Sequence, residues 1–431
     1  MQKTYSALII AGLVLLPSLI FAQFNNNTTS PFSRFGLGDL HGLSHGRTVA
    51  MGGATLGSRN SQQINFANPA SYTSTDSLAF LFEFGVNAKF SSYKSSLDKF
   101  SANDINFRYF SLSFPISKNI STAMGLTPYS DVGYDVRINQ DLPGSGAVSH
   151  LYYGEGSLSR AFIGVGVSPF RNISVGANLY YFFGSLTRNA YISFPENAEM
   201  YTIERTDGIR LRDFGLNFGL QATVPIDKEQ SVTIGATLEN KPKFTAFSSD
   251  VAYKTLIISI PNQNPRSDRE NLIDLTEEKS KIVMPLSTGL GVSYVKNNKL
   301  EINADYYFQQ WSEASFLGSP YVFLTDRSIV AVGGEYIPDK FSIRSYASRM
   351  AYRAGINFEN SYLLSNNQQV KDFGITFGVG LPVYRSNSTI NVSAELGRRG
   401  STKSNLIREN YMKLNLSVNL YDFWFVKRRF D

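Results

Sequence analysis

The chain contains no cysteine among its 431 residues, and only 18% of them are charged. The lack of cysteine excludes disulfide scaffolds, cysteine-ligated zinc, iron–sulfur clusters, thiol nucleophiles and a cysteine-anchored lipoprotein. The formal net charge is +6, but no five like charges occur in a row, which argues against a nucleic-acid partner. Glycine (34 residues) and aromatic residues (13%) are abundant instead. This composition does not fit a helical enzyme and is too apolar for a disordered chain.

Long apolar runs are confined to the N-terminus. Lys3 precedes an apolar stretch over residues 7–21, and Ala22 followed by Gln23 offers a small-residue cleavage point. The stretch is short for a membrane-spanning helix, so we expect residues 1–22 to be a cleaved secretory signal peptide, with an uncleaved anchor as the alternative. The sequence therefore predicts an exported protein.

Period-two alternation of apolar with polar or glycine residues repeats along the chain from about residue 77. It is clearest over residues 173–181, 300–306, 373–381 and 412–420. Because successive side chains of a strand point to opposite faces, each such segment is expected to be a strand with one apolar face. Fourteen strands are predicted, over residues 77–93, 104–115, 119–130, 150–168, 172–189, 208–225, 230–241, 281–296, 299–311, 327–338, 350–362, 370–384, 388–399 and 409–425.

The links between these strands alternate in length. Five links are tight, at residues 116–118, 169–171, 226–229, 295–298 and 385–387. The intervening links are predicted to be long loops, at residues 94–103, 131–149, 190–207, 242–280, 312–326, 363–369 and 400–408. Short turns at one end and long loops at the other are typical of an outer-membrane β-barrel, although the link at 339–349 is longer than the other turns at its end.

A membrane location requires a closed sheet, since every backbone polar group within hydrocarbon needs a partner. We therefore predict a 14-stranded antiparallel transmembrane barrel over residues 77–431, with the apolar face toward outer-membrane lipid. A secreted soluble β-protein is the alternative. Six charged residues fall on otherwise regular strands, and we expect them to pair with one another and with a plug rather than to line a polar channel: Glu83, Glu301, Asp305, Glu335, Arg353 and Glu395.

Residues 23–76 do not alternate and are rich in glycine, serine and asparagine. A segment of this length ahead of a wide barrel is expected to fold back as a hatch that plugs the lumen. The stretch Gly46-Arg47-Thr48-Val49-Ala50-Met51-Gly52-Gly53-Ala54 followed by Asn68-Pro69-Ala70 resembles the N-terminal hatch of the FadL family of long-chain fatty-acid transporters. On this resemblance the hatch residues are Gly46, Arg47, Gly52, Gly53, Asn68, Pro69 and Ala70.

The resemblance implies an integral outer-membrane channel of a Gram-negative bacterium that takes up hydrophobic small molecules. Apolar residues of the predicted loops are candidate ligand contacts, because burial of each methylene gains about 0.8 kcal/mol. They are Phe247, Leu256, Ile257, Phe316, Leu317, Tyr321 and Phe323. Gly125 and Pro128 could open the wall, since glycine weakens a strand and proline cannot donate a ladder hydrogen bond, although Pro128 is also suited to end a strand.

Two other functions are weighed against transport. A FadL-like barrel can also serve as an accessory subunit of an outer-membrane protein secretion or assembly complex, with other outer-membrane proteins as partners. An outer-membrane hydrolase is disfavoured: Ser44 within Gly42–Gly46 matches G-x-S-x-G, but no strand–turn–helix pattern surrounds it. His41 and His45 have helical zinc-ligand spacing, yet the neighbouring glycines argue against a helix. We expect no catalytic residue, metal or cofactor.

Overall fold

The computed structural model describes residues 27–95, 98–143, 146–195, 200–255, 270–315, 324–365, 367–402 and 407–423. The predicted signal peptide lies outside these residues. Within the described part of the chain, no helix is long and apolar enough to cross a membrane.

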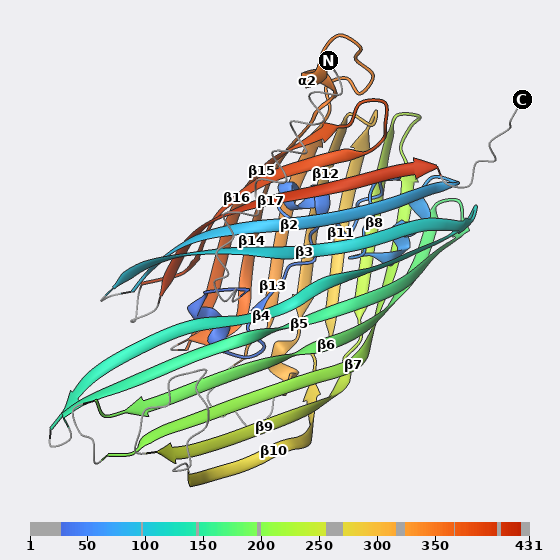
Figure 1. The fold of residues 1–431 in the computed structure, drawn as a ribbon. Helices are drawn as coiled ribbons and strands as arrows, with labels where there is room; N and C mark the ends of the chain where they lie inside the picture. Colours follow the sequence, from blue (N-terminus) through green and yellow to red (C-terminus); the bar gives the residue numbers. More distant parts are fainter. Residues whose placement is uncertain are drawn as a thin grey trace, which may run out of the picture.

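Long β-strands dominate the molecule (Figure 1). Among the described residues, short helices occur only in the N-terminal segment and in two links: η2 (Pro31–Arg34), η3 (Gly46–Met51), η4 (Pro69–Ser74), η5 (Trp311–Glu313) and α2 (Tyr346–Arg349). The strands are β1 (Asp39–Leu40), β2 (Ala79–Lys94), β3 (Lys99–Ser117), β4 (Ile120–Leu142), β5 (Gly146–Phe170), β6 (Ile173–Ser193), β7 (Thr202–Pro225), β8 (Gln230–Glu239), β9 (Lys243–Thr255), β10 (Glu270–Val283), β11 (Ser287–Lys296), β12 (Leu300–Gln309), β13 (Arg327–Tyr336), β14 (Ala351–Ser365), β15 (Gln368–Pro382), β16 (Thr389–Gly400) and β17 (Arg408–Phe423).

Strands β2 to β17 form a closed antiparallel barrel. Consecutive strands pair with one another, except β8 with β9 and β10 with β11, and β17 returns to pair with β2. β8 and β9 both pair with β7 and are two parts of one wall strand. β11 pairs with β8 and β10 pairs with β9, so β10 and β11 are two parts of the next wall strand. The sixteen labelled strands therefore make fourteen wall strands. Pro242 and Pro285 lie in the two interruptions, where they cannot donate a ladder hydrogen bond. The predicted 14-stranded barrel is confirmed.

The distribution of side chains is the reverse of that in a soluble β-protein. On β17, Leu414 and Leu416 are 40% and 45% exposed, whereas Asn415 and Ser417 are each 7% exposed. The same inversion is seen on β11 and β16, where exposed large hydrophobic residues alternate with buried polar or small ones. An apolar outer belt around a polar interior is what a lipid-facing barrel requires.

The strands run farther than the sequence pattern suggests. The predicted long loops 94–103 and 131–149 are mostly strand, because β2 and β3 extend to Lys94 and Lys99, and β4 and β5 extend to Leu142 and Gly146. The predicted loop 242–280 is likewise wrong, since it contains β9 and β10. Backbone pairing continues in these segments although their side chains no longer alternate, because the ladder uses main-chain groups. Four of the five tight turns are confirmed, while the β15–β16 link, predicted at 385–387, is longer and spans residues 383–388.

Wall height is uneven around the ring. β5 has 25 residues and β4 has 23, whereas β12 and β13 have 10 each. At 3.3 Å per residue, β5 is about 80 Å long, well beyond a hydrocarbon core of about 30 Å even with tilt. Figure 1 shows β4–β7, β9 and β10 reaching far past β2 and β14–β17 at the long-loop end. By the usual orientation of such barrels, this is the extracellular end.

Residues 27–76, here called the hatch, lie inside the barrel (Figure 1). Its helices η3 and η4 contact strands on opposite sides of the ring, η3 against β13–β17 and η4 against β4–β7. The short strand β1 pairs with the inner part of β4, Asp39 opposite Asp131 and Leu40 opposite Ser130. The hatch therefore spans the lumen from wall to wall.

Candidate functional site: the hatch-filled lumen

The two predicted hatch motifs form the starts of short helices. Asn68 precedes η4, its side-chain oxygen accepts a hydrogen bond from the Ala70 N–H at 3.2 Å, and Pro69 takes the first helical position, where no N–H partner is needed. The Asn68 side-chain amide donates to the Leu56 carbonyl at 2.9 Å. The Asn-Pro-Ala motif thus ends one hatch loop and ties it to another.

Arg47, in η3, is the centre of a buried ion-pair network. Its guanidinium lies 2.7 Å from the Glu301 carboxylate on β12 and 2.8 Å from the Glu335 carboxylate on β13. Arg353 on β14 contacts the other oxygen of Glu335 at 2.6 Å. Burial alone would lower the pKa of Arg47, but the two carboxylates outweigh it and raise the pKa. The arginine is therefore charged and joins the hatch to two strands.

The remaining lumen charges also meet the hatch or each other. Glu83 accepts a hydrogen bond from the hatch Ile64 N–H at 2.9 Å, and Asp305 accepts one from the Leu56 N–H at 2.8 Å. Glu395 pairs with Lys413 at 3.4 Å. The prediction that these charges bond to one another and to the hatch is confirmed.

Gly52 and Gly53 let the chain leave η3 against the barrel wall. Gly52 has a φ of +68° and Gly53 one of +92°, conformations that residues with a Cβ rarely adopt. A Cβ on Gly52 would also collide with the Ile356 carbonyl of β14. The wall meets this turn with a glycine of its own, Gly355. These glycines allow backbone to pack directly on backbone.

Ser44 and His45 each have partners elsewhere in the described structure. The Ser44 hydroxyl and carbonyl accept hydrogen bonds from Arg108 at 3.2 and 2.9 Å, and the His45 ring contacts the carbonyls of Leu43 and Ile64. His45 is also stacked on Phe66, with centroids 3.9 Å apart. His41, the other candidate metal ligand, contacts Asp131 at 2.6 Å. No cluster of three or more metal-ligating side chains occurs in the described ranges.

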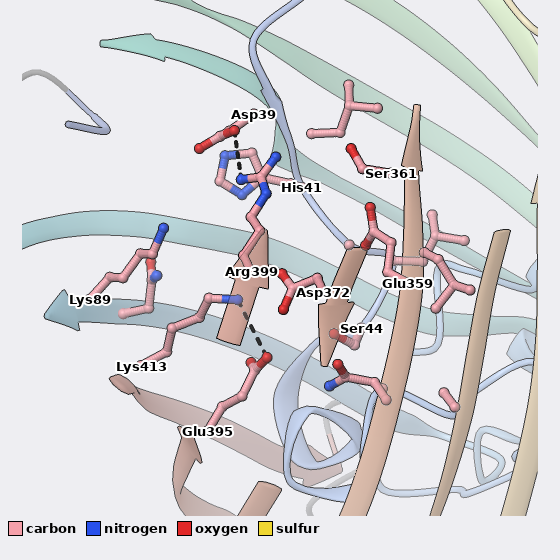
Figure 2. A pocket seen from close by; sticks show the side chains of 18 of the residues that line it. Asp39, His41, Ser44, Lys89, Glu359, Ser361, Asp372, Glu395, Arg399 and Lys413 are labelled. Atoms are coloured by element: carbon pink, nitrogen blue, oxygen red, sulfur yellow. Dashed lines mark hydrogen bonds and ion pairs between the residues drawn. The ribbon is translucent and has the colours of Figure 1, made fainter. Parts of the chain in front are cut away.

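An outer cavity of about 220 Å³ lies between the hatch and the walls of β2, β3 and β12–β17 (Figure 2). Its lining is dense in charged residues, most of which, unlike Asp305 and Glu395, the sequence analysis did not single out. The ion pairs along it include Asp39–Arg399 at 2.8 Å, Lys89–Glu409 at 2.6 Å and Glu395–Lys413 at 3.4 Å. Burial raises the pKa of Asp39, but Arg399 and Lys89 outweigh it, so the hatch carboxyl has a lowered pKa and is ionised. This space suits ions rather than an aliphatic chain.

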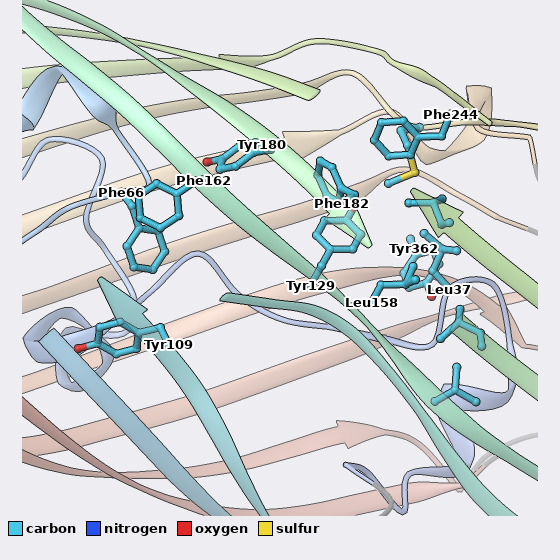
Figure 3. Close-up of a cluster of buried hydrophobic side chains, with 14 of the residues drawn as sticks. Leu37, Phe66, Tyr109, Tyr129, Leu158, Phe162, Tyr180, Phe182, Phe244 and Tyr362 are labelled. Atoms are coloured by element: carbon cyan, nitrogen blue, oxygen red, sulfur yellow. The ribbon is translucent and has the colours of Figure 1, made fainter. Parts of the chain in front are cut away.

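A cluster of buried aromatic side chains fills the lumen beside β4–β9 (Figure 3). Phe182 contacts both Tyr129 and Phe244, with ring centroids 5.1 and 4.9 Å apart. Phe162 reaches the hatch residue Phe66 at 5.3 Å. The sequence analysis missed this cluster because its members lie on inward positions that were expected to be polar or small. It packs the hatch against the tall part of the wall.

Of the seven predicted hydrophobic ligand contacts, only Phe247 lies within the described residues. Phe247 lies on β9 rather than in a loop, where it is half-buried beneath the Arg210 guanidinium at 5.2 Å. The other candidates lie outside the described residues: Leu256, Ile257, Phe316, Leu317, Tyr321 and Phe323. Their role remains a prediction.

Gly125 and Pro128 lie on β4 where its pairing with β3 ends. The β3–β4 ladder runs from Ser117 opposite Ile120 to Phe110 opposite Leu126, and no described strand pair joins β3 and β4 beyond that point. The β4–β5 register shifts between Pro128 and Ser130. Figure 1 shows β3 and β4 diverging toward the extracellular end. Pro128 does not end the strand, since β4 continues to Leu142.

The family model named BamG matches residues 1–431, the whole chain. The chain belongs to the BamG family. No curated protein matches it. Solved structures share its fold at low identity: the toluene transporter TodX of Pseudomonas putida (15% identity, TM-score 0.58, 89% of this chain and 98% of that one), the CymD monoaromatic hydrocarbon channel (13%, 0.54, 91% and 100%) and a FadL homologue of Pseudomonas aeruginosa (11%, 0.56, 89% and 99%).

Membership of the BamG family and likeness to FadL-type barrels are separate findings. At these identities the structural likeness establishes the barrel architecture, which is that of outer-membrane transport channels. The resemblance read from the hatch motif is thus supported at the level of fold, while the family itself is BamG.

Proposed function

We propose that this BamG-family protein is a hatch-plugged outer-membrane barrel that serves as a structural subunit of an outer-membrane protein secretion or assembly complex. The observation that carries the proposal is the Arg47 network, in which the hatch is held to β12 and β13 by buried ion pairs. Such a connection is costly to break, because it would leave buried charges without partners. The fold then supplies a rigid, closed cylinder with an apolar belt.

The polarity of the lumen also favours a subunit over a conduit. An apolar solute gains free energy by entering an apolar site, whereas the outer cavity holds the Asp39–Arg399, Lys89–Glu409 and Glu395–Lys413 ion pairs. Displacing water from charged groups without replacing its hydrogen bonds is unfavourable. Membership of the BamG family is consistent with the subunit role. We propose no catalytic activity, cofactor or nucleic-acid partner.

Uptake of hydrophobic small molecules is the second candidate function. Two observations favour it: the fold is shared with the TodX toluene transporter at a TM-score of 0.58, and pairing between β3 and β4 stops beside Gly125. On this proposal, fatty-acid-like or aromatic solutes or lipids would be captured at the loops and leave through the wall near Pro128. Under both proposals the protein is integral to the outer membrane of a Gram-negative bacterium and contacts its lipid.

Purification in mild detergent followed by native mass spectrometry separates the two functions. A subunit is expected to leave the membrane in a fixed stoichiometry with another outer-membrane protein. The purified barrel alone, reconstituted in vesicles, is expected to take up labelled toluene or palmitate no faster than empty vesicles. Saturable uptake by a barrel that purifies without a stoichiometric partner would overturn the subunit proposal and support transport.

A further inference from the structure

The link between β13 and β14, residues 337–350, is unlike the other turns at its end of the barrel. The turns at 118–119, 171–172 and 297–299 have two or three residues, whereas this link contains the helix α2. Figure 1 shows α2 and its loop standing beyond the strand ends, opposite the tall extracellular wall. We call residues 337–350 the mouth loop.

The mouth loop exposes two large apolar side chains. Phe341 is 85% exposed and Ile343 is 98% exposed, more than any residue of the lipid-facing belt. The loop nevertheless has a defined shape: the Asp339 N–H donates to the Ser348 carbonyl at 2.8 Å, and the Asp339 carboxylate accepts from the Phe341 N–H at 3.1 Å. A fixed loop that presents apolar groups to solvent is a feature of interaction sites.

The mouth loop lies beside the lumen and contacts the hatch. The Lys340 ammonium donates to the side chain of Gln62 in the hatch at 3.5 Å. Phe341 lines an inner cavity of about 660 Å³, which is also lined by Gln62 and Arg59 of the hatch. The Tyr346 hydroxyl donates to the Pro382 carbonyl of β15 at 3.1 Å, which holds the loop beside the barrel opening.

The surroundings of the two apolar side chains are basic. Lys340, Arg344 and Arg349 belong to the mouth loop, and Lys299 and Arg385 line the same inner cavity. Within the described part of the chain, none of these five cations forms an ion pair with a carboxylate. The Arg349 Nε–H is buried and has no hydrogen-bond acceptor. Unpaired cations around exposed apolar groups call for a partner with carboxylates.

We propose that the mouth loop docks a periplasmic protein that presents an apolar pocket bordered by carboxylates. Phe341 and Ile343 enter the pocket, while Lys340, Arg344 and Arg349 pair with the acidic border. Aromatic anchors and arginines are the residue types that dominate protein interfaces. The contact with the hatch and the place beside the lumen favour a protein over the membrane surface. This inference rests on the proposed subunit role and names the side on which that partner binds.

Site-specific photo-crosslinking in intact cells tests the site. A benzoylphenylalanine at position 341 of the full-length protein is expected to give one discrete protein adduct. Benzoylphenylalanine in place of Phe170 is the control and is expected to give no protein adduct. Phe170 is 68% exposed and lies at a turn on the same end of the barrel. An adduct to lipid alone, or equal adducts at both positions, would overturn the proposal. Heat-modifiable gel migration of each variant verifies that the barrel has folded.

Charge reversal tests the chemistry of the partner. The double variant Lys340→Glu/Arg344→Glu is expected to reduce the position-341 adduct at least tenfold, whereas Lys118→Glu/Lys228→Glu, at other turns of the same end, leaves it unchanged. Mass spectrometry of the adduct should find aspartate or glutamate beside the crosslinked peptide. Changing those partner residues to lysine should restore the adduct to the reversed variant. An adduct that survives reversal, or a crosslinked peptide without carboxylates, contradicts the proposal.

The outcomes also separate this inference from the subunit role. If the wild-type protein purifies with a stoichiometric partner but position 341 gives no adduct, the docking site is wrong and the subunit role stands. If neither a stable complex nor an adduct is found, both proposals fail.

Discussion

At the scale of single residues, Arg47 decides how firmly the hatch is held. Its guanidinium is shared between Glu301 and Glu335, and Arg353 completes the network from a third strand. The four groups are all buried. The pairs need not add net stability compared with an apolar core, but removal of one partner leaves buried charge behind. The hatch therefore cannot shift at η3 without disrupting the network.

Replacing Arg47 by alanine is expected to destabilise the folded protein by about 3–5 kcal/mol, because Glu301 is left buried without a cation. Thermal unfolding in detergent, followed by heat-modifiable migration, measures the effect. Arg59→Ala is the matched control, since Arg59 is a partly buried hatch arginine that bonds to Ser174 and Gln221 rather than to a carboxylate. Its loss is expected to cost about 1–2 kcal/mol. Equal effects of the two substitutions would contradict the role of the ion pairs.

His45 is expected to make hatch stability depend on pH. Burial lowers the pKa of His45 to about 4, although the carbonyls of Leu43 and Ile64 act in the opposite direction. In the unfolded chain the pKa is about 6.5, so the unfolded state takes up the proton first as pH falls. The stabilisation is complete above that value and is lost between pH ~6.5 and pH ~4, in total roughly 3 kcal/mol.

The measurement is the Tm of the wild type and of His45→Gln at pH 7.5, 6 and 5. The wild type should lose stability faster than the variant as the pH falls, because the variant lacks the titrating ring. Parallel curves would show that another group controls the pH dependence.

At the scale of secondary-structure elements, the interrupted β3–β4 pairing determines how the barrel wall is closed. β3 pairs with β2 from Lys99 to Ser113, but its pairing with β4 is limited to Phe110–Ser117. The hatch partly substitutes, as β1 pairs with β4 at Ser130 and Asp131. One wall position is thus closed partly by strand pairing and partly by the hatch.

Hydrogen–deuterium exchange is expected to reveal this difference. In an antiparallel strand, alternate N–H groups point to opposite neighbours, so about half of the amides over Lys99–Asp104 should exchange rapidly. The comparison is Asn391–Leu396 of β16, which has ladder partners on both sides, β15 and β17. Uniform protection of both segments would mean that β3 has a second partner in solution.

At the scale of the whole molecule, the hatch occupies the lumen of a wide barrel, and we expect it to close that lumen. Contacts of η3 and η4 reach opposite sides of the ring, and the aromatic cluster around Phe182 fills the lumen beside the tall strands. A closed cylinder fits a partner-binding role, whereas a transporter must open it in each cycle. Conductance distinguishes these behaviours.

Single-channel recording in planar bilayers is expected to show no steady conductance for the wild type. Deletion of residues 27–76 should give large, stable openings, because a 14-stranded barrel without its plug encloses a wide lumen. Refolded wild type with the same conductance as the deletion variant would show that the hatch does not seal the barrel.

The barrel could be predicted from the sequence because lipid imposes a regular pattern on the strands. Leu414 and Leu416 alternate with Asn415 and Ser417, which is visible in the sequence alone. The ends of the strands could not be predicted in this way, since beyond the membrane the ladder continues without alternation. The loop predicted at 242–280 failed for this reason.

The candidate site was predictable only in part. The sequence indicated which segments form the hatch and that charges on the strands would meet it. It did not indicate that Arg47 selects Glu301 and Glu335, which are 254 and 288 residues away. Nor did it indicate the Lys89–Glu409 pair, because strand register and closure at β17–β2 bring those two side chains together.

The uneven height of the barrel wall affects how large molecules can approach the extracellular opening. β4 and β5 rise far above the bilayer, while β12 and β13 stop near it. A macromolecule that diffuses along the outer leaflet therefore meets a high wall on one side of the barrel and a low wall on the other. A large molecule can therefore reach the extracellular opening only from the side of the short strands, so the protein restricts the direction of approach.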